Sequence, residues 1–156
     1  MRTIALSISA ALTLAMFGCG GGGGGDAAPP STPTAATAPP TTFAEQVSLG
    51  QKLYSAKCAS CHGAGGEGGA SAPRLVGLDK GALSLDPPAS SKARRAQFKT
   101  AADVAGFVVK NMPPGGDAEL KESDYWAILA FDLHANGVDL PHRVDASNAA
   151  SVVLHP

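Results

Sequence analysis

The alternation of apolar and polar residues along this 156-residue chain predicts three amphipathic helices. The first helix is expected to follow Thr42, which starts a Thr-x-x-Glu capping box with Glu45, and to end near Cys58. Its recurrent positions, spaced by three and four residues, are Phe43, Val47, Gly50, Leu53, Tyr54 and Lys57. No run of four or more residues alternates strongly enough to indicate a strand, so the fold class is predicted to be all-α.

The second predicted helix begins at Thr100, where Asp103 takes the place of Glu in a similar capping box. Its buried side is expected to carry Val104, Phe107 and Val108. The Pro113–Pro114 pair ends this helix, because proline removes a backbone donor and biases the preceding residue away from helical geometry.

The third predicted helix runs from about Glu122 to the Asn136–Gly137 pair, which is typical of a left-handed C-cap. Its apolar positions are Tyr125, Ile128, Leu129 and Leu133, with Trp126 and Phe131 on flanking faces. Between the first two helices lies an irregular segment, residues 63–99. Since a loop of this length is unusual in a compact domain, something central must organise it.

The N-terminus is predicted to be a leader. A short positive start is followed by an apolar run to Met16, which is shorter than the roughly 20 residues of a spanning helix. The run ends Met16-Phe17-Gly18-Cys19, which resembles a bacterial lipobox. Residues 1–18 are therefore expected to be a signal peptide of the lipoprotein type, with cleavage before a lipidated Cys19. The alternative is ordinary cleavage further downstream.

Residues 19–41 are expected to be the lipidated cysteine followed by a flexible linker. The segment after Cys19 contains only Gly, Asp, Ala, Pro, Ser and Thr, so it offers too little apolar area to offset the entropy of ordering. The ordered domain is predicted over residues 42–137, with a C-terminal extension at residues 138–156.

The overall charge argues against a nucleic-acid partner. Twelve Lys and Arg residues balance thirteen Asp and Glu residues, and phosphate contacts require a positive excess. Only 5% of the residues are aromatic, so a small core would gain from a large apolar cofactor.

The candidate chemistry lies in the sequence Cys58-Ala59-Ser60-Cys61-His62, which is the Cys-x-x-Cys-His attachment motif for c-type haem. Two thiols three residues apart can each add to a haem vinyl group, and the next residue, His62, then lies under the iron. A redox-active dithiol would require a βαβ context, and a zinc site would require further Cys or His ligands. Neither is present in the sequence, so one covalent haem c is predicted.

Without a sixth ligand, the haem iron would have an open coordination position and would be reactive. Met1 and Met16 lie in the leader, so Met112 is the one thioether expected in the mature chain. It directly precedes Pro113, where the helix is forced to end. The rival histidines are His134, His142 and His155. His134 is expected to face solvent at the last turn of the third helix, where a cation suits the helix dipole.

Together these residues resemble the class I cytochrome c family over about residues 42–137. Gly50 and Tyr54 match the family's first helix, and Ile128 with Phe131 match its terminal helix. The segment Ala72-Pro73-Arg74-Leu75-Val76-Gly77 resembles the family's Gly-Pro-x-Leu-x-Gly, with Ala72 in place of the first Gly. The resemblance implies a cytochrome c fold wrapped around one haem. It also implies that the Pro73 carbonyl accepts the proton on the second ring nitrogen of His62.

The expected function is electron transfer by a membrane-tethered monohaem cytochrome with His/Met ligation, because a six-coordinate iron has no vacant position. Its partners would be redox proteins. It would be located on the periplasmic side of a bacterial membrane, or would be free in the periplasm or secreted if the lipobox is not used. The alternative is a cytochrome c subunit of a membrane-associated dehydrogenase or oxidase complex. A peroxidase-like enzyme would need an open iron face, for which the sequence offers no distal His-Arg pair.

The sequence leaves the role of two further segments undecided. The basic residues Lys92, Arg94, Arg95 and Lys99 form either a docking patch for an acidic partner or, the favoured interpretation, a solvated face. The C-terminal extension, with Val152, Val153 and Leu154, would either form an interface or fold back on the haem domain.

Overall fold

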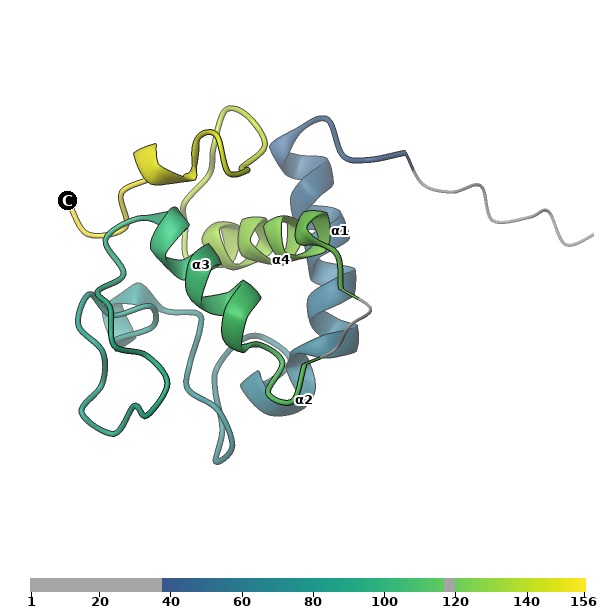
Figure 1. Cartoon of the computed structure of the whole chain (residues 1–156). Coiled ribbons are helices and arrows are strands. Elements are labelled where there is room, and N and C mark those ends of the chain that lie inside the picture. The colour runs from purple at the N-terminus through teal and green to yellow at the C-terminus, as the bar shows by residue number, and fades with distance from the viewer. Residues whose placement is uncertain (1–37, 117–119) are drawn as a thin grey trace, which may run out of the picture. The chain divides into compact units, whose positions relative to one another are not determined.

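The computed structural model describes residues 38–116 and 120–156, and within them the fold is all-α (Figure 1). The predicted leader, Cys19 and nearly all of the linker lie outside the described residues. Within these described residues, four α-helices and two short 3-10 helices follow one another. They are α1 (Phe43–Lys57), α2 (Ala59–His62), η1 (Leu78–Lys80), α3 (Ala101–Asn111), α4 (Glu122–Ala135) and η2 (Ala149–Ser151).

The bounds of the three main helices confirm the sequence prediction. At α1, the Glu45 backbone N–H donates to the Thr42 hydroxyl, and the Glu45 carboxylate accepts from the Thr42 N–H. At α3, Asp103 closes the same kind of capping box on Thr100. α3 ends at Asn111, directly before Met112 and the proline pair. At the amino ends of α1 and α3, a local side chain thus supplies the partner that a free backbone N–H group requires.

Helices α1 and α4 cross at Gly50, and this crossing is the centre of the domain (Figure 1). A Cβ atom built on Gly50 would lie 1.9 Å from the backbone oxygen of Ala127, so only glycine fits here. Beside the crossing, the rings of Tyr54 and Phe131 pack with their centroids 5.1 Å apart. The backbones of the two helices are therefore in direct contact, as the resemblance at Gly50 implies.

Helix α4 is buried around more of its circumference than one apolar stripe predicts. Ala127, Ile128, Leu129, Ala130, Asp132 and Leu133 are all buried. The reason is that α4 packs against α1 on one side and α3 on another, so that it has no wide solvent face along this stretch. The buried Asp132 was not expected from the sequence.

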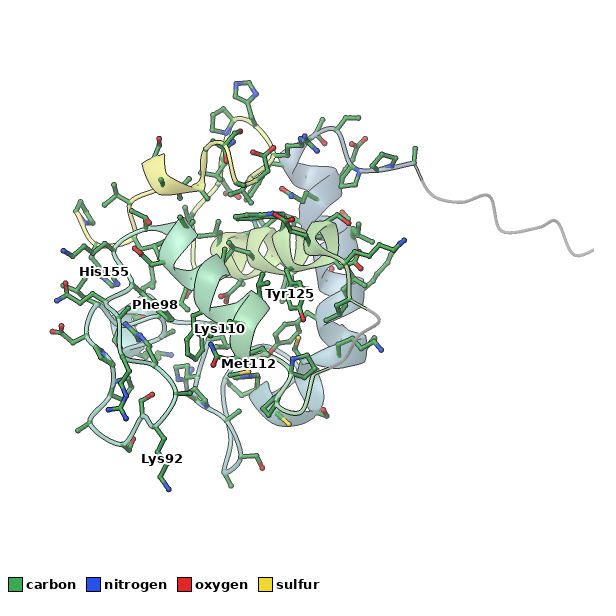
Figure 2. All side chains as sticks on the ribbon, viewed as in Figure 1. Lys92, Phe98, Lys110, Met112, Tyr125 and His155 are labelled. Atoms are coloured by element: carbon green, nitrogen blue, oxygen red, sulfur yellow. The ribbon has the colours of Figure 1, made fainter. Side chains whose placement is uncertain are left out.

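The long segment between α2 and α3 is organised by backbone bonds and by Arg94. The Arg94 guanidinium donates to the carbonyl groups of Ser84, Leu85 and Ala96. Its centre also lies 3.5 Å from the centroid of the Phe98 ring. The expectation that Arg94 belongs to a solvated basic face is therefore wrong, because the side chain is buried and used internally. Lys92, by contrast, lies at the outer edge of the loop and points away from the domain (Figure 2).

The C-terminal extension folds back on the helical domain. Val144, Ala149 and Leu154 belong to the same buried core as α3 and α4. Gln46 of α1 forms two buried hydrogen bonds to the extension. Its Nε2 donates to the Val144 carbonyl (2.8 Å), and its Oε1 accepts from the Val144 N–H (2.9 Å). Val153, which is 54% exposed, forms an isolated bridge with Thr100. Residues 138–156 are thus built into the domain.

Candidate haem site

The Cys-x-x-Cys-His segment lies at the end of α1 and forms the single turn α2. Cys58 caps α1 through its N–H, which donates to the Tyr54 carbonyl. The Tyr54 hydroxyl in turn donates to the Gly63 carbonyl at 2.8 Å, so that Tyr54 bonds one end of the turn through its backbone and the other through its side chain. Cys58 is half-buried and Cys61 is exposed, and both are free thiols. The two sulfur atoms therefore belong to a turn whose backbone is fixed by α1.

The His62 ring is buried and oriented by one hydrogen bond. Its Nδ1 atom lies 2.8 Å from the carbonyl oxygen of Pro73. Because a carbonyl can only accept, Nδ1 carries the proton and Nε2 is the nitrogen that a metal can use. This contact is the one that the family resemblance implies, and it forms although Ala72 replaces the first glycine of the motif.

A tight loop of glycines brings Pro73 to His62. The Gly68 N–H donates to the His62 carbonyl at 2.7 Å, and the Gly66 carbonyl accepts from both Leu75 and Val76. Gly68 has a φ of +79°, and a Cβ atom there would lie 2.6 Å from the Arg74 nitrogen. A side chain at this position would push the Pro73 segment away from His62.

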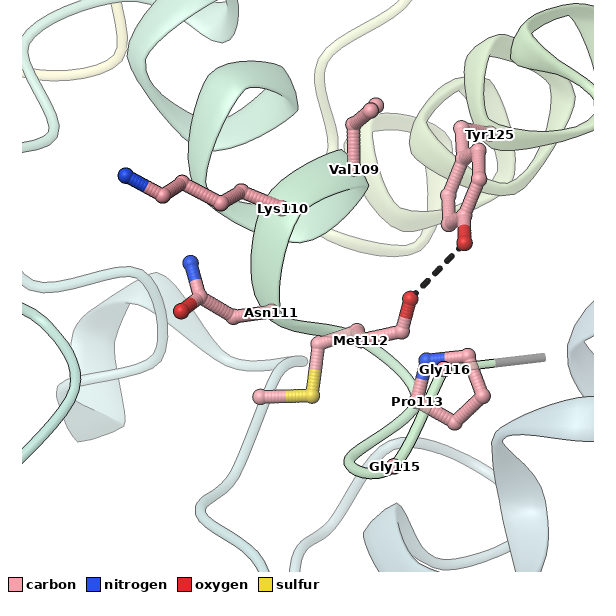
Figure 3. A pocket seen from close by; sticks show the side chains of 8 residues that line it. All are labelled: Val109, Lys110, Asn111, Met112, Pro113, Gly115, Gly116 and Tyr125. Atoms are coloured by element: carbon pink, nitrogen blue, oxygen red, sulfur yellow. Dashed lines mark hydrogen bonds between the residues drawn. The ribbon is translucent and has the colours of Figure 1, made fainter. Parts of the chain in front are cut away.

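Met112 lies at the carboxyl end of α3, where its N–H donates to the Val108 carbonyl. Its backbone carbonyl accepts a 2.8 Å hydrogen bond from the Tyr125 hydroxyl, and its thioether side chain projects away from Tyr125 (Figure 3). A surface cavity of about 320 Å³ adjoins this point, lined by Val109, Lys110, Asn111, Met112, Pro113, Gly115, Gly116 and Tyr125. The Met112 backbone is thus anchored to both α3 and α4.

Two of the three rival histidines, His134 and His155, have other partners. His134 is exposed, and its Nδ1 lies 2.6 Å from the Asp139 carboxylate. The His155 Nε2 bonds the Leu83 carbonyl, and His142 is exposed. His134 therefore faces solvent, as the sequence predicts.

Burial changes the acidity of several groups beside this site. It raises the pKa of Tyr54 to about 12 and the pKa of Asp132 to about 8. It also raises the pKa of the Cys58 thiol, with a smaller contribution from the nearby Asp132 carboxylate. Asp132 is therefore largely protonated at neutral pH.

Asn136 was predicted only as part of a helix cap, but the structure gives it further contacts. Its Oδ1 accepts from the Gly77 N–H at 2.7 Å, and its Nδ2 donates to the Leu75 carbonyl at 2.8 Å. These partners are about 60 residues away in sequence, so no local pattern indicates the contact.

The donor set of this region fits haem c and fits a bare metal ion poorly. The described residues contain no group of three or more His, Cys, Asp or Glu side chains placed to hold a metal ion. They do offer two free thiols on one turn and, beside them, an imidazole whose Nδ1 is already bonded. Both thiols and the free Nε2 are the groups that thioether attachment and iron ligation use.

A family model described as cytochrome c oxidase, cbb3-type, subunit III, matches residues 45–131, which is more than half of the chain. The chain belongs to this c-type cytochrome family. The match begins within α1, includes the Cys-x-x-Cys-His turn and ends within α4. The family implies haem c as the cofactor, and a c-type cytochrome domain is an electron carrier.

Two similar proteins give this cytochrome a more specific context. A thiosulfate dehydrogenase of Allochromatium vinosum is 34% identical over 87 residues, which is 54% of this chain and 29% of that protein. A solved structure, the sulfane dehydrogenase SoxCD of Paracoccus pantotrophus, is 33% identical with a TM-score of 0.52, over 69% of this chain and 52% of the solved one. The cytochrome thus spans about a third to a half of these two relatives, and the shared region has the cytochrome c fold.

Proposed function

We propose that this cytochrome carries electrons with a single haem c, attached through Cys58 and Cys61 and ligated by His62 and Met112. The observation that carries the proposal is the buried His62 ring, which lies on the turn that bears both thiols and whose Nδ1 is bonded to the Pro73 carbonyl. Haem c would supply a one-electron couple at its iron.

The chain's own residues have three tasks in this proposal. The two cysteines hold the group, which prevents its loss from a small domain. His62 is kept in one tautomer by Pro73, so that its Nε2 is always ready to ligate. Tyr125 fixes the backbone at Met112, so that a flexible thioether is presented from a rigid position.

An optical spectrum of protein matured with haem tests the ligand assignment. Met112→Ala should lose the low-spin signature and bind carbon monoxide readily in the reduced state, whereas the wild type should bind it poorly. Val109→Ala is a matched control, since Val109 is an exposed residue lining the same cavity. An unchanged spectrum in Met112→Ala would contradict thioether ligation.

Mass spectrometry tests the covalent attachment. The double variant Cys58→Ser/Cys61→Ser should show loss of the covalent haem adduct.

We also propose that the mature protein is a lipoprotein, anchored through Cys19 on the periplasmic side of a bacterial membrane. The support is the sequence: a short positive start, an apolar run and a cysteine at its end. Within the described residues, no helix has both the length and the apolar character needed to cross a bilayer. Cys19→Ala should move the protein from the membrane fraction to the periplasmic extract. A wild-type protein that is already in that extract would contradict the anchor.

The second candidate function is a fixed cytochrome subunit of a dehydrogenase or oxidase complex. Its support is that both similar proteins are named dehydrogenases and are longer than the shared region. We infer that a partner would then be a redox enzyme acting on a reduced sulfur compound. Extraction in mild detergent should recover a stoichiometric partner with this cytochrome if it is a subunit, and the cytochrome alone if it is a free carrier.

A further inference from the structure

Asn136 connects the end of α4 to the segment that contacts His62. Its Nδ2 donates to the Leu75 carbonyl at 2.8 Å, and its Oδ1 accepts from the Gly77 N–H at 2.7 Å. One side-chain amide therefore forms hydrogen bonds to the backbone at Leu75 and at Gly77. The segment that it grips begins just after Pro73, whose carbonyl holds the His62 ring.

The orientation of this amide is fixed from within α4. Nδ2 also bonds the backbone carbonyl of Asp132 at 2.9 Å and lies 3.3 Å from the Asp132 Oδ1 atom. If the amide were flipped, an oxygen would face the backbone carbonyl oxygens of Leu75 and Asp132, and an NH2 group would face the Gly77 N–H. The surroundings therefore permit one orientation of the amide.

The Pro73 segment is held from two sides. On the side of the haem-binding turn, the Gly66 carbonyl accepts from Leu75 and Val76 at 2.8 and 3.0 Å. On the other side, Asn136, which caps the carboxyl end of α4, donates to the Leu75 carbonyl and accepts from the Gly77 N–H. α4 is a buried helix against the domain core. The segment is thus tied both to Gly66 and, through Asn136, to α4.

We propose that Asn136 is a positioning residue for the axial ligand His62, acting through the Leu75–Gly77 backbone and the Pro73 carbonyl. This inference rests on the proposed function, because it treats His62 as the ligand of a haem iron. A hydrogen bond at Nδ1 makes a ligating imidazole more basic and fixes its plane. Loss of Asn136 should loosen the Pro73 carbonyl, weaken that hydrogen bond and raise the reduction potential.

A purely structural role would be a rival explanation, since Asn136 also caps α4. Gln46 supplies the matched control. It too is an amide that bonds both backbone groups of a distant segment, at Val144, but that segment belongs to the C-terminal extension and not to the Pro73 segment. Gln46→Ala should therefore lower stability without changing the His62 ring.

The experiment compares wild type, Asn136→Ala and Gln46→Ala as haem-loaded proteins. Solvent exchange of the His62 Nδ1 proton is followed by NMR in the reduced state, together with the reduction potential. Asn136→Ala should accelerate that exchange at least tenfold and raise the potential, whereas Gln46→Ala should leave both near wild type. The proposal is overturned if Asn136→Ala matches the wild type in both readouts, or if both variants move them equally.

A second variant covers the case in which Asn136→Ala does not fold. Asn136→Asp keeps an oxygen to accept from Gly77 and removes the donation to Leu75, so a smaller change in the same direction is expected. No change in either readout would overturn the proposal. If the wild type itself carries no haem or shows no His62 ligation, it is the proposed function that fails, and this result is seen before any variant is compared.

Discussion

The hydroxyl group of Tyr125 on α4 donates a 2.8 Å hydrogen bond to the backbone carbonyl of Met112 at the end of α3 (Figure 3). α3 has ended at Asn111, so this carbonyl belongs to the first residue that is not in the helix. The bond therefore fixes the proposed ligand at the point where its own helix no longer does so.

Tyr125→Phe should weaken the attachment of Met112. Loss of one half-buried hydrogen bond lowers the free energy of unfolding by about 1 kcal/mol. In the haem-loaded protein, displacement of Met112 by cyanide should become about fivefold easier, which corresponds to the same free energy. Trp126→Phe is the control, because it removes an exposed hydrogen bond to Glu122 on the same helix. Equal cyanide affinities in the wild type and Tyr125→Phe would contradict the prediction.

Gly50→Ala should strongly destabilise the domain. The new Cβ atom would lie 1.9 Å from the Ala127 oxygen, so α1 and α4 must move apart, at a cost of about 3 kcal/mol. Urea unfolding measures this change. Gly106→Ala is the matched control within α3, because a Cβ atom there has nothing within 4 Å. That variant should gain about 1 kcal/mol, as alanine favours a helix over glycine. Similar unfolding midpoints for the two variants would rule out the close crossing.

Asp132 should make the domain less stable as the pH rises towards 8. Burial raises the folded-state pKa of this carboxyl to about 8, far above its ordinary value of 3.8. Between these values the folded state binds one proton more than the unfolded state, so raising the pH favours unfolding. The contribution is fully present below about pH 4 and is lost as the pH passes through about 8. Its slope is at most a tenfold loss in the folding constant per pH unit.

Urea unfolding of the wild type and Asp132→Asn between pH 5 and 8 tests this dependence. The asparagine variant keeps an oxygen towards Asn136 and cannot titrate, so its stability should change less with pH. The two groups on and next to α1 that interact electrostatically with Asp132 are Tyr54 and Cys58, and burial raises the pKa of both. Asp79→Asn, at an exposed carboxyl, serves as control. Parallel pH profiles for wild type and Asp132→Asn would disprove the assignment.

Gln46→Ala should release the C-terminal extension. The substitution leaves both backbone groups of the buried Val144 without their partners, which costs about 2 kcal/mol. Limited proteolysis should then cut within residues 138–156 at lower protease concentrations than in wild type. Ser48→Ala, which removes an exposed bond within α1, should not change the cleavage. Resistance of Gln46→Ala equal to that of the wild type would show that the core contacts of the extension suffice.

The helix termini were predictable because their causes are local. Thr42 with Glu45, Thr100 with Asp103, and the proline pair after Met112 all act within four residues. The Cys-x-x-Cys-His turn is equally local, since its five residues are consecutive. The Pro73 contact followed from the family resemblance, and the structure forms it despite Ala72.

The buried polar side chains were not predictable in the same way. Gln46 bonds a residue 98 positions away, and Asn136 bonds residues 59 and 61 positions away. Arg94 has the sequence context of a surface charge, yet its partners are backbone carbonyls brought together by the loop. Asp132 is buried because α4 packs against two helices at once.

The sequence alone determined which residues are chemically competent here: two thiols, one imidazole and one thioether, placed at helix ends by capping residues and prolines close to them. Only the tertiary structure decided how the imidazole is oriented, which backbone supports it and where the C-terminal extension packs. The physical reason is that helix ends depend on groups within one turn, whereas a buried hydrogen bond depends on which distant backbone the folded chain brings within 3 Å.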